Sequence, residues 1–305
     1  MIEGFGQEGA ALAASERPHD GAGVADGLVA LKLDDALRPW LTGFAHRRDS
    51  NCGQVVFELP ELRPTIQIMM ADDYWLRDRD DPKSWQPVPR ISLWGPRVAW
   101  GYGYARRFVH AFGMGLTPRG FADIIGRPAA DYADRVVDLA GVRPDLAREL
   151  ALIVAAGDAV DWARATAALL SRIVAVGDDS VGDALDRSLP HLIEDEADAV
   201  RRASGAAGLG ERQYRRLFQS RYGFSPRLYR RVQRVDRLLR RLHPAPWETD
   251  VHEPDLNFAD QPHMIREFKA LTGVTPGEYV RSKRTHGDAT IRSVIATGIA
   301  PPPKA

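Results

Sequence analysis

The residues best suited to chemistry lie in one short segment rich in arginine and glutamine. Arg212, Arg215, Arg216 and Gln219 recur at the spacing of one helix face, because residues three and four apart are neighbours on a helix. Arginine pairs bidentately with guanine and glutamine with adenine, so these side chains suit the reading of base edges in the major groove of DNA. The alternative is an ordinary solvated helix face, since arginine is a good helix former.

A second set of residues in the same segment must support this face. Tyr214, Leu217, Phe218 and Tyr222 recur at i, i+3, i+4 and i+8, which predicts a packed face on the opposite side of the same helix. Gly208 allows the positive φ of a tight turn just before it. The pattern therefore predicts a helix, a glycine turn and a second helix that packs on one side and carries arginine on the other.

The charge of the chain is strongly divided, although its formal sum is zero. Residues 1–200 carry a net charge of −10, and residues 201–284 carry +9. Residues 201–241 alone contain 13 Arg and no Lys, opposed by one Glu and one Asp. A positive field of this density raises the on-rate for a polyanion and releases its counterions. Nucleic acid is therefore the leading candidate partner.

Four ordered segments resemble a known protein family. Taken together, they resemble the AraC/XylS family of bacterial transcription regulators, over about residues 197–282. The segments are residues 209–218, 222–229, 258–269 and 272–279. The resemblance implies two helix-turn-helix units joined by a long helix. Their recognition helices would enter successive major-groove segments on one face of double-stranded DNA, about 34 Å apart.

The resemblance also implies which side chains face the DNA. Its groove-facing positions in the first unit fall on Arg212, Arg215 and Arg216, beside Gln219 on the same face. In the second unit they fall on Gln261, Pro262, His263 and Arg266, of which Pro262 offers a base no donor or acceptor. Phosphate contacts, which hold register without reading sequence, are expected from Arg227, Arg230, Arg231, Arg234 and Lys269.

The second unit departs from the family pattern ahead of Phe258. Where the family shows an apolar residue, an Ala and later a Gly, this chain has His252, Glu253 and Asn257, with Pro254 between them. A proline inside a helix costs about 3 kcal/mol, so the supporting helix is expected to be shortened or to begin at Pro254. We expect the first unit to supply most of the affinity and specificity, and the second mainly to position the protein.

The N-terminal half shows a different periodicity. Short runs with period-two alternation, bounded by Gly, Pro and Asp, predict an antiparallel sheet or small barrel with strands at residues 54–59, 65–70, 90–94 and 107–114. After Gly141 the period becomes helical, and two amphipathic helices are expected to pack on the sheet or on each other, with dimerisation as the alternative. The fold class is therefore α+β, with an N-terminal antiparallel barrel-like domain, linking helices and an all-α tandem helix-turn-helix domain.

These patterns divide the chain into five expected parts. They are a loose lead-in (1–30), a β-rich sensor domain (31–142), linking or dimerisation helices (143–178), the tandem helix-turn-helix domain (179–285) and a tail (286–305). Gly and Pro spacings between residues 94 and 139 resemble the small β-barrel sensor domain that precedes the DNA-binding module in one branch of the family. That resemblance implies a small-molecule effector or a pairing role. Aromatic residues could line its pocket or simply fill the core: Trp40, Trp75, Trp94, Trp100, Tyr102 and Tyr104.

The competing hypothesis for a barrel that contains histidine is a metal-dependent cupin-type enzyme, or a small-molecule-binding protein with a basic helical appendage. His46 and His110 have no close His or Glu partner of the kind that metal ligands favour, and Cys52 is the single cysteine. We therefore expect no catalytic residues, no metal and no cofactor. One cysteine and the lack of an apolar run of about 18 residues predict a soluble cytoplasmic protein. RNA polymerase and a second copy of the chain are further candidate partners.

Overall fold

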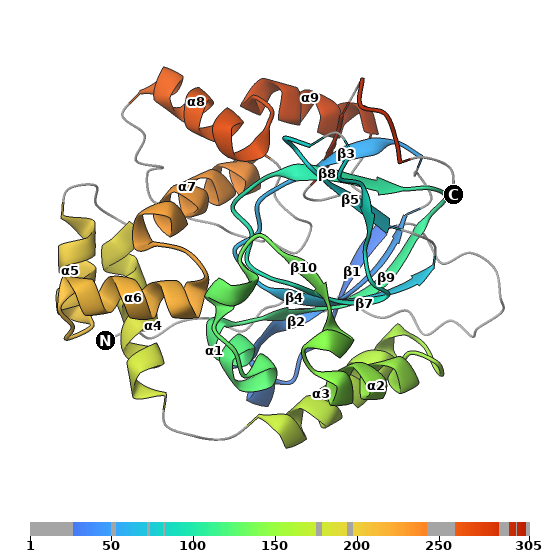
Figure 1. Ribbon diagram of the computed structural model, residues 1–305, viewed down its shortest axis with the longest axis horizontal. Coiled ribbons are helices and arrows are strands. Elements are labelled where there is room, and N and C mark those ends of the chain that lie inside the picture. Colours follow the sequence, from blue (N-terminus) through green and yellow to red (C-terminus); the bar gives the residue numbers. More distant parts are fainter. Residues whose placement is uncertain are drawn as a thin grey trace.

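The computed structural model describes residues 27–49, 53–71, 74–81, 83–174, 179–193, 198–242, 260–286, 293–296 and 298–302. Two β-sheets form one part of the molecule, two helices cover the sheets from below, and a group of helices packs beside and above them (Figure 1). The expected α+β class, with a sheet-rich N-terminal region and a helical C-terminal region, is confirmed. Within these described residues, no helix is long and apolar enough to cross a membrane.

The larger sheet has six antiparallel strands, and one of its faces carries most of the core. Alternate residues such as Ile66, Ile68, Phe112 and Met114 are buried on that face, as the period of two along a strand requires. In order across the sheet, the strands are β1 (Gly27–Leu31), β2 (Leu41–Asp49), β9 (Val109–Leu116), β4 (Thr65–Ala71), β7 (Ile91–Trp94) and β10 (Val136–Asp138).

The second sheet has five strands and ends on a segment from the far end of the chain. In order, its strands are β11 (Ser293–Ile295), β3 (Val55–Glu58), β8 (Gly101–Ala105), β5 (Tyr74–Asp78) and β6 (Gln86–Pro87). The strands expected near residues 54–59, 65–70, 90–94 and 107–114 correspond to β3, β4, β7 and β9.

Two strands lie wholly or mostly outside the region 31–142 in which the sequence predicted a sheet. β1 falls partly in the expected lead-in, and β11 lies in the expected tail. Both are edge strands that pair with a single neighbour, β2 and β3 respectively. Backbone groups make those hydrogen bonds whatever the side chains are, so an edge strand does not need the apolar alternation by which a sequence reveals it. Val29, for example, is 52% exposed.

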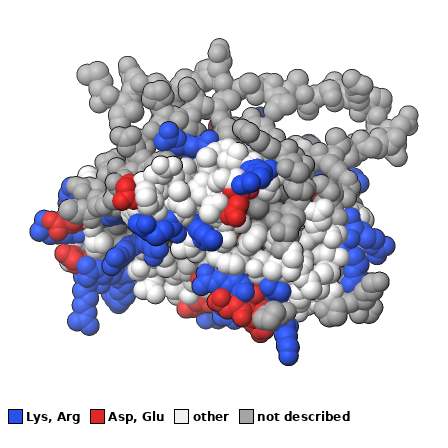
Figure 2. Space-filling model, turned by 90° about the horizontal axis from the view of Figure 1, so that it is seen from above, with Lys and Arg blue, Asp and Glu red and all other residues white. Residues whose placement is uncertain are grey.

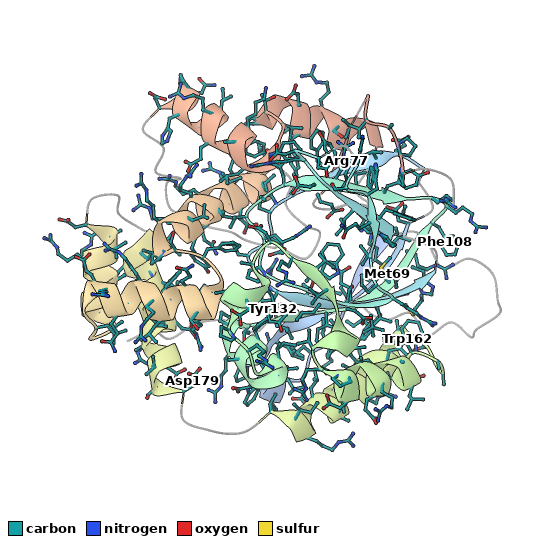
Figure 3. All side chains as sticks on the ribbon, viewed as in Figure 1. Met69, Arg77, Phe108, Tyr132, Trp162 and Asp179 are labelled. Carbon is teal, nitrogen blue, oxygen red and sulfur yellow. The ribbon has the colours of Figure 1, made fainter. Side chains whose placement is uncertain are left out.

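The two helices that follow the sheets are α2 (Pro144–Ile153) and α3 (Ala159–Ile173). α3 begins at Asp158, whose side chain accepts hydrogen bonds from the N–H groups of Val160 and Asp161, the usual stabilisation of a helix start. Leu146, Leu150, Leu169 and Leu170, on the faces predicted to be apolar, join the buried face of the six-stranded sheet. The expected packing of these helices on the sheet is confirmed, and Trp162 marks it in Figure 3.

The remaining helices lie beside and above the sheets. α4 (Ser180–Ile193), α5 (Ala199–Ala206) and α6 (Glu211–Tyr222) form one group, and α8 (Gln261–Thr272) and α9 (Pro276–His286) form another. α7 (Pro226–Leu242) runs between the two groups (Figure 1). A short helix α1 (Pro118–Gly120) and the turn at Ala129–Tyr132 lie on the side of the sheets that faces α6.

Candidate nucleic-acid interface

The first candidate unit consists of α5, a glycine turn and α6. Gly208 has a φ of +68° and reverses the chain, as the sequence predicted, because only glycine adopts this conformation without strain. Tyr214, Phe218 and Tyr222 on the inner face of α6 are buried, with the rings of Phe218 and Tyr222 stacked 4.2 Å apart. The hydroxyl of Tyr214 forms a 2.9 Å hydrogen bond with Ser188 of α4. The apolar stripe of α6 therefore holds it against α4, and its other face is left outward.

That outward face carries the side chains that the sequence singled out. Arg212, Arg215, Arg216 and Gln219 are all exposed. Arg215 pairs with Glu211 one turn earlier, at 2.7 Å between Nη2 and Oε2, in a solvent-exposed ion pair of the kind that contributes little to stability. Gln213 is also exposed near the start of α6, and the sequence analysis did not single it out. The face offers donors and acceptors that a groove of DNA can receive.

Arg221, by contrast, serves inside the protein. Its side chain is 9% exposed and lies 2.9 Å from carboxylate oxygens of both Asp179 and Asp186. Burial works against its charge, but the hydrogen bond and charge of Asp186 outweigh it and raise the pKa of Arg221. Tyr222 also donates a hydrogen bond to Asp186, and burial followed by the Asp186 charge raises the pKa of Tyr222. These contacts tie the end of α6 to α4.

α8, the described helix of the second candidate unit, is built like α6 but has a side-chain cap at its start. α6 and α8 each have 12 residues and each end at a left-handed glycine, Gly223 and Gly273. The Asp260 side chain accepts a 2.6 Å hydrogen bond from the N–H of His263 and so caps α8. Pro262 lies in the first turn, where its missing N–H costs nothing. Arg216 and Arg266 are each the sixth residue of their helix, the equivalence that the resemblance implied.

α8 exposes fewer polar side chains than α6. Gln261, Arg266 and Lys269 are exposed, while His263 is half-buried with Nε2 3.8 Å from Glu267 Oε2. Pro262 is exposed as well. Residues 252–257, with Pro254 and Asn257, lie outside the described residues, so the expected shortening of the supporting helix stays a prediction.

The predicted phosphate contacts occupy different environments. Arg227 is exposed and Arg230 is half-buried on α7. Arg231 and Arg234 both reach Glu267 of α8, with Arg231 Nε 2.9 Å from Oε1 and Arg234 Nη2 2.9 Å from Oε2. The Arg234 side chain is only 8% exposed. The sequence could not reveal this pairing, because Glu267 lies 33 residues away from Arg234 and the two meet only when α7 and α8 pack together.

Apolar residues complete the contact of α7 with the second unit. Val232, Val235 and Leu239 of α7 are buried together with Phe268 and Tyr279. Figure 2 shows Lys and Arg side chains over much of this face of the molecule, several of them on the left of the view, the side on which Figure 1 places α5, α6 and α8. The helical part thus presents cations on its surface over an apolar, well-packed interior.

The six aromatic residues predicted for an effector pocket do not form one single cluster. Trp40 is buried beneath the six-stranded sheet, where its indole N–H donates to Asp123. Trp94 lies in a cluster between the two sheets with Met69 and Tyr74. A third cluster contains Trp100, Tyr102 and Tyr104 together with Phe57. Trp75 of β5 is half-buried opposite Tyr104.

A pocket is found at a different place, between the sheets and α7. It has a volume of about 150 Å³. Four of its residues come from the connection after β3 and four from α7: Pro60, Glu61, Leu62, Arg63, Val232, Gln233, Asp236 and Arg237.

The two histidines of the sheet region meet each other. His46 of β2 and His110 of β9 form a 3.0 Å contact between their Nε2 atoms, beside the ring of Trp162. Burial lowers the pKa of both, and nearby positive charge lowers it further. Among the described residues there is no group of three or more His, Cys, Asp or Glu that could hold a metal ion. Cys52 lies outside the described residues.

Comparison with known proteins identifies the helical region. Residues 203–282 match the family model described as "Helix-turn-helix domain", and no curated protein matches the chain. Among solved structures, the chain is similar to crystal structures of ToxT from Vibrio cholerae. One is 11% identical, covering 78% of this chain and 98% of that chain with a TM-score of 0.43, and the unsaturated fatty acid-bound wild-type form is 10% identical, covering 78% and 95% with a TM-score of 0.44.

The match to the helix-turn-helix model agrees with the glycine turn and α6 of the first unit, the connecting helix α7 and the similarly built α8. Residues 203–282 therefore form a helix-turn-helix domain, a DNA-binding module, as the resemblance to the AraC/XylS regulators implied.

Proposed function

We propose that the chain reads a specific double-stranded DNA operator by placing α6 and α8 in successive major-groove segments. The observation that supports this most directly is the parallel construction of the two helices. Each has 12 residues, a buried aromatic at its eighth position, an exposed arginine at its sixth and a left-handed glycine at its end. Arginine at such a position can donate two hydrogen bonds to guanine.

The two units do not contribute equally in this proposal. α6 exposes three arginines and Gln219 along its outer face, whereas α8 exposes Gln261 and Arg266 around Pro262, with His263 half-buried. The first unit supplies most of the base reading, and the second unit mainly sets the register. Arg227 and Lys269, both exposed, remain assigned to phosphate contacts, with Arg230 beside them. Arg231 and Arg234 act instead on α8 through Glu267.

A small-molecule effector bound by the N-terminal sheets is a second part of the proposal. The pocket between the connection after β3 and α7 supports it, because a ligand there would touch both the sheets and the connecting helix. Its volume, about 150 Å³, is smaller than most ligand pockets and suits a ligand about the size of benzene, or one end of a larger ligand. The six predicted aromatic residues are not proposed as one common pocket, since Trp40 and Trp94 lie in clusters apart from that of Trp100, Tyr102 and Tyr104, which Trp75 faces on the neighbouring strand.

The proposal assigns the protein no catalytic activity, and it adds two partners. A regulator acts at a promoter, where RNA polymerase also binds. A second copy of the chain would have exposed apolar side chains to cover at Leu152 of α2 and Val160 of α3, which are 64% and 54% exposed, a pattern typical of interaction surfaces when such side chains are contiguous.

DNA retardation by the full chain tests the main proposal. A library of genomic fragments is incubated with the protein at low salt, and retarded fragments are sequenced. We expect a small set of retarded fragments that share two short sequence motifs. The affinity of the protein for them should fall steeply as the salt concentration rises. Uniform retardation of all fragments, or none, would contradict sequence-specific reading. Adding an unsaturated fatty acid, the ligand named for one of the ToxT structures, gives a first probe of effector control.

A further inference from the structure

Both recognition helices end against one short segment of the N-terminal sheets. A Cβ atom placed on Gly223, at the end of α6, would lie 2.5 Å from Cγ of Pro96. One placed on Gly273, at the end of α8, would lie 2.9 Å from Cδ2 of Trp100 and 3.0 Å from Phe57. Such separations leave no room for a side chain, so these glycines are in close contact with the sheets. Residues 96–100, which connect β7 to β8, thus touch both units; we call them the bridging segment.

The middle of the bridging segment also contacts the connecting helix. Val98 packs against the buried cluster formed by Val232 and Val235 of α7 with Phe268 of α8. Leu59, at the end of β3, is buried in the same cluster. The segment therefore follows the helical domain from the end of α6, along α7, to the end of α8. In Figure 3, Tyr132 marks the part of the sheet domain that faces α6.

Hydrogen bonds to the backbone hold the bridging segment in place. The Asp134 carboxylate accepts from the N–H groups of Val98 and Ala99 at 2.8 and 3.0 Å, and the Asp134 N–H donates to the carbonyl of Pro96 at 2.9 Å. Arg97 and Glu61 exchange both backbone hydrogen bonds, at 3.0 and 2.7 Å. Asp134 adopts a φ of +54° to do this, a conformation that Asp and Asn tolerate better than most residues.

The side chain of Arg97 anchors the segment to the space between the sheets. Its Nη2 lies 3.4 Å from Glu58 Oε2, and its guanidinium lies 4.9 Å from the centre of the Trp94 ring. Tyr74 donates a hydrogen bond to the same carboxylate. Because Arg97 and Glu58 are 14% and 15% exposed, moving the segment would separate a largely buried ion pair, which is strongly unfavourable.

We propose that the bridging segment determines which spacing of half-sites the protein accepts. A segment that touches the ends of both α6 and α8 fixes the separation of the two helices. Successive major-groove segments recur every 10–10.5 base pairs. The separation of the helices therefore selects the number of base pairs between the two DNA motifs that they read. The N-terminal sheets would thus determine part of the DNA specificity without touching DNA. This inference rests on the proposed function of α6 and α8.

The first test measures the separation of the helices without DNA. Spin labels are attached to Arg215→Cys and Arg266→Cys in a chain carrying Cys52→Ser, and their distance distribution is recorded by pulsed electron paramagnetic resonance. We expect one narrow distribution, which Trp100→Ala broadens or shifts. The matched control is Trp85→Ala, which removes an equally large, half-buried side chain from the same aromatic cluster. A Trp100→Ala distribution identical to that of the unsubstituted chain would overturn the proposal.

A second pair of variants covers the case in which Trp100→Ala does not fold. Asp134→Ala removes the acceptor for Val98 and Ala99, whereas Asp134→Asn keeps one oxygen acceptor and tolerates the positive φ. We expect a broadened distribution for the alanine variant and a narrow one for the asparagine variant. Identical distributions for the two, with both proteins folded by circular dichroism, would contradict the assigned role of the segment.

The last test reads the spacing on DNA. Duplexes that bind the full chain, or Trp100→Ala, are selected from a random pool, and the number of base pairs between the two enriched motifs is determined. We expect one dominant spacing between the two motifs for the full chain. In Trp100→Ala, the preference for that spacing over neighbouring spacings should fall by roughly fivefold or more, while the two motifs themselves stay the same. An unchanged spacing preference overturns the proposal. A chain that retards no DNA contradicts the proposed function instead, and the label distances then still report on the segment.

Discussion

Arg234 of α7 and Glu267 of α8 meet inside the helical domain, with Arg234 Nη2 2.9 Å and 3.1 Å from the two carboxylate oxygens of Glu267. Their side chains are 8% and 4% exposed. Arg231 adds a further hydrogen bond to the same carboxylate from one turn earlier on α7. Glu267 points inward from the helix that carries Arg266 outward, so the ion pair sets the orientation of the second recognition helix.

Neutralising Glu267 should therefore destabilise the folded protein. In Glu267→Gln, Arg234 keeps its charge in a buried site without a full counter-charge, and such a change costs about 3–5 kcal/mol. The denaturant midpoint of the full chain measures it. The control is Glu211→Gln, which removes the exposed partner of Arg215 and should change stability by less than about 1 kcal/mol. Equal midpoints for the two variants would show that the buried pair does not position α8.

Arg216 should matter more for DNA binding than Arg266. Each is the sixth residue of its recognition helix, but the outer face of α6 carries more hydrogen-bonding side chains than that of α8. Arg216→Ala should weaken operator binding by about 1–3 kcal/mol, or 5- to 150-fold, and Arg266→Ala by less. Both are compared by retardation of the same fragment at the same salt concentration. A larger loss from Arg266→Ala would reverse the ranking of the two units.

Phosphate contacts should appear as a change in salt dependence and not as a change in sequence preference. Arg227→Ala and Lys269→Ala should each lower the slope of log affinity against log salt by about 0.9, because each removes one neutralised phosphate. Arg164→Ala on α3, whose side chain is 74% exposed, serves as the control for loss of a surface arginine. A slope that stays the same in Arg227→Ala would remove that residue from the DNA-binding surface.

The histidine pair should make stability depend on pH. Burial lowers the pKa of His46 and His110 below the usual value of about 6.5. At pH values between the folded-state pKa and 6.5, the unfolded chain therefore binds more protons than the folded chain. Stability from this source is complete above about pH 6.5 and is lost as the pH falls toward the folded-state pKa values. The surrounding groups are Arg48, which adds to the lowering at both rings, and Asp158, which opposes it at His46.

Thermal unfolding of the chain at pH 7.5 and pH 5.5 measures this dependence. We expect a lower melting temperature at pH 5.5, and a smaller difference between the two pH values in a His46→Gln, His110→Gln double variant. The matched control is His191→Gln on α4, outside the sheets, which should leave the difference as it is in the unsubstituted chain. A double variant that keeps the full difference would place the titrating groups elsewhere.

Much of the helical domain could be predicted from local pattern. The stripe Tyr214, Phe218 and Tyr222 and the outward arginines of α6 recur with the helical period, so which face packs follows from the sequence alone. Gly208 marks the turn for the same reason, because few other residues adopt its φ. The strands β3, β4, β7 and β9 were likewise visible in apolar alternation. The edge strands β1 and β11 were not, since their backbone hydrogen bonds impose no pattern on side chains.

The amino-acid sequence by itself determined which helices form, which of their faces are apolar and where positive charge is concentrated, because these depend on residues within a few turns of one another. Only the tertiary structure decided which arginines are available to DNA. Arg221, Arg231 and Arg234 look like their neighbours in sequence, yet each pairs with a carboxylate on another helix, and that packing largely buries Arg221 and Arg234. The contact of Pro96 and Trp100 with the two turn glycines is of the same kind, since it joins residues more than 100 positions apart, and only packing brings them together.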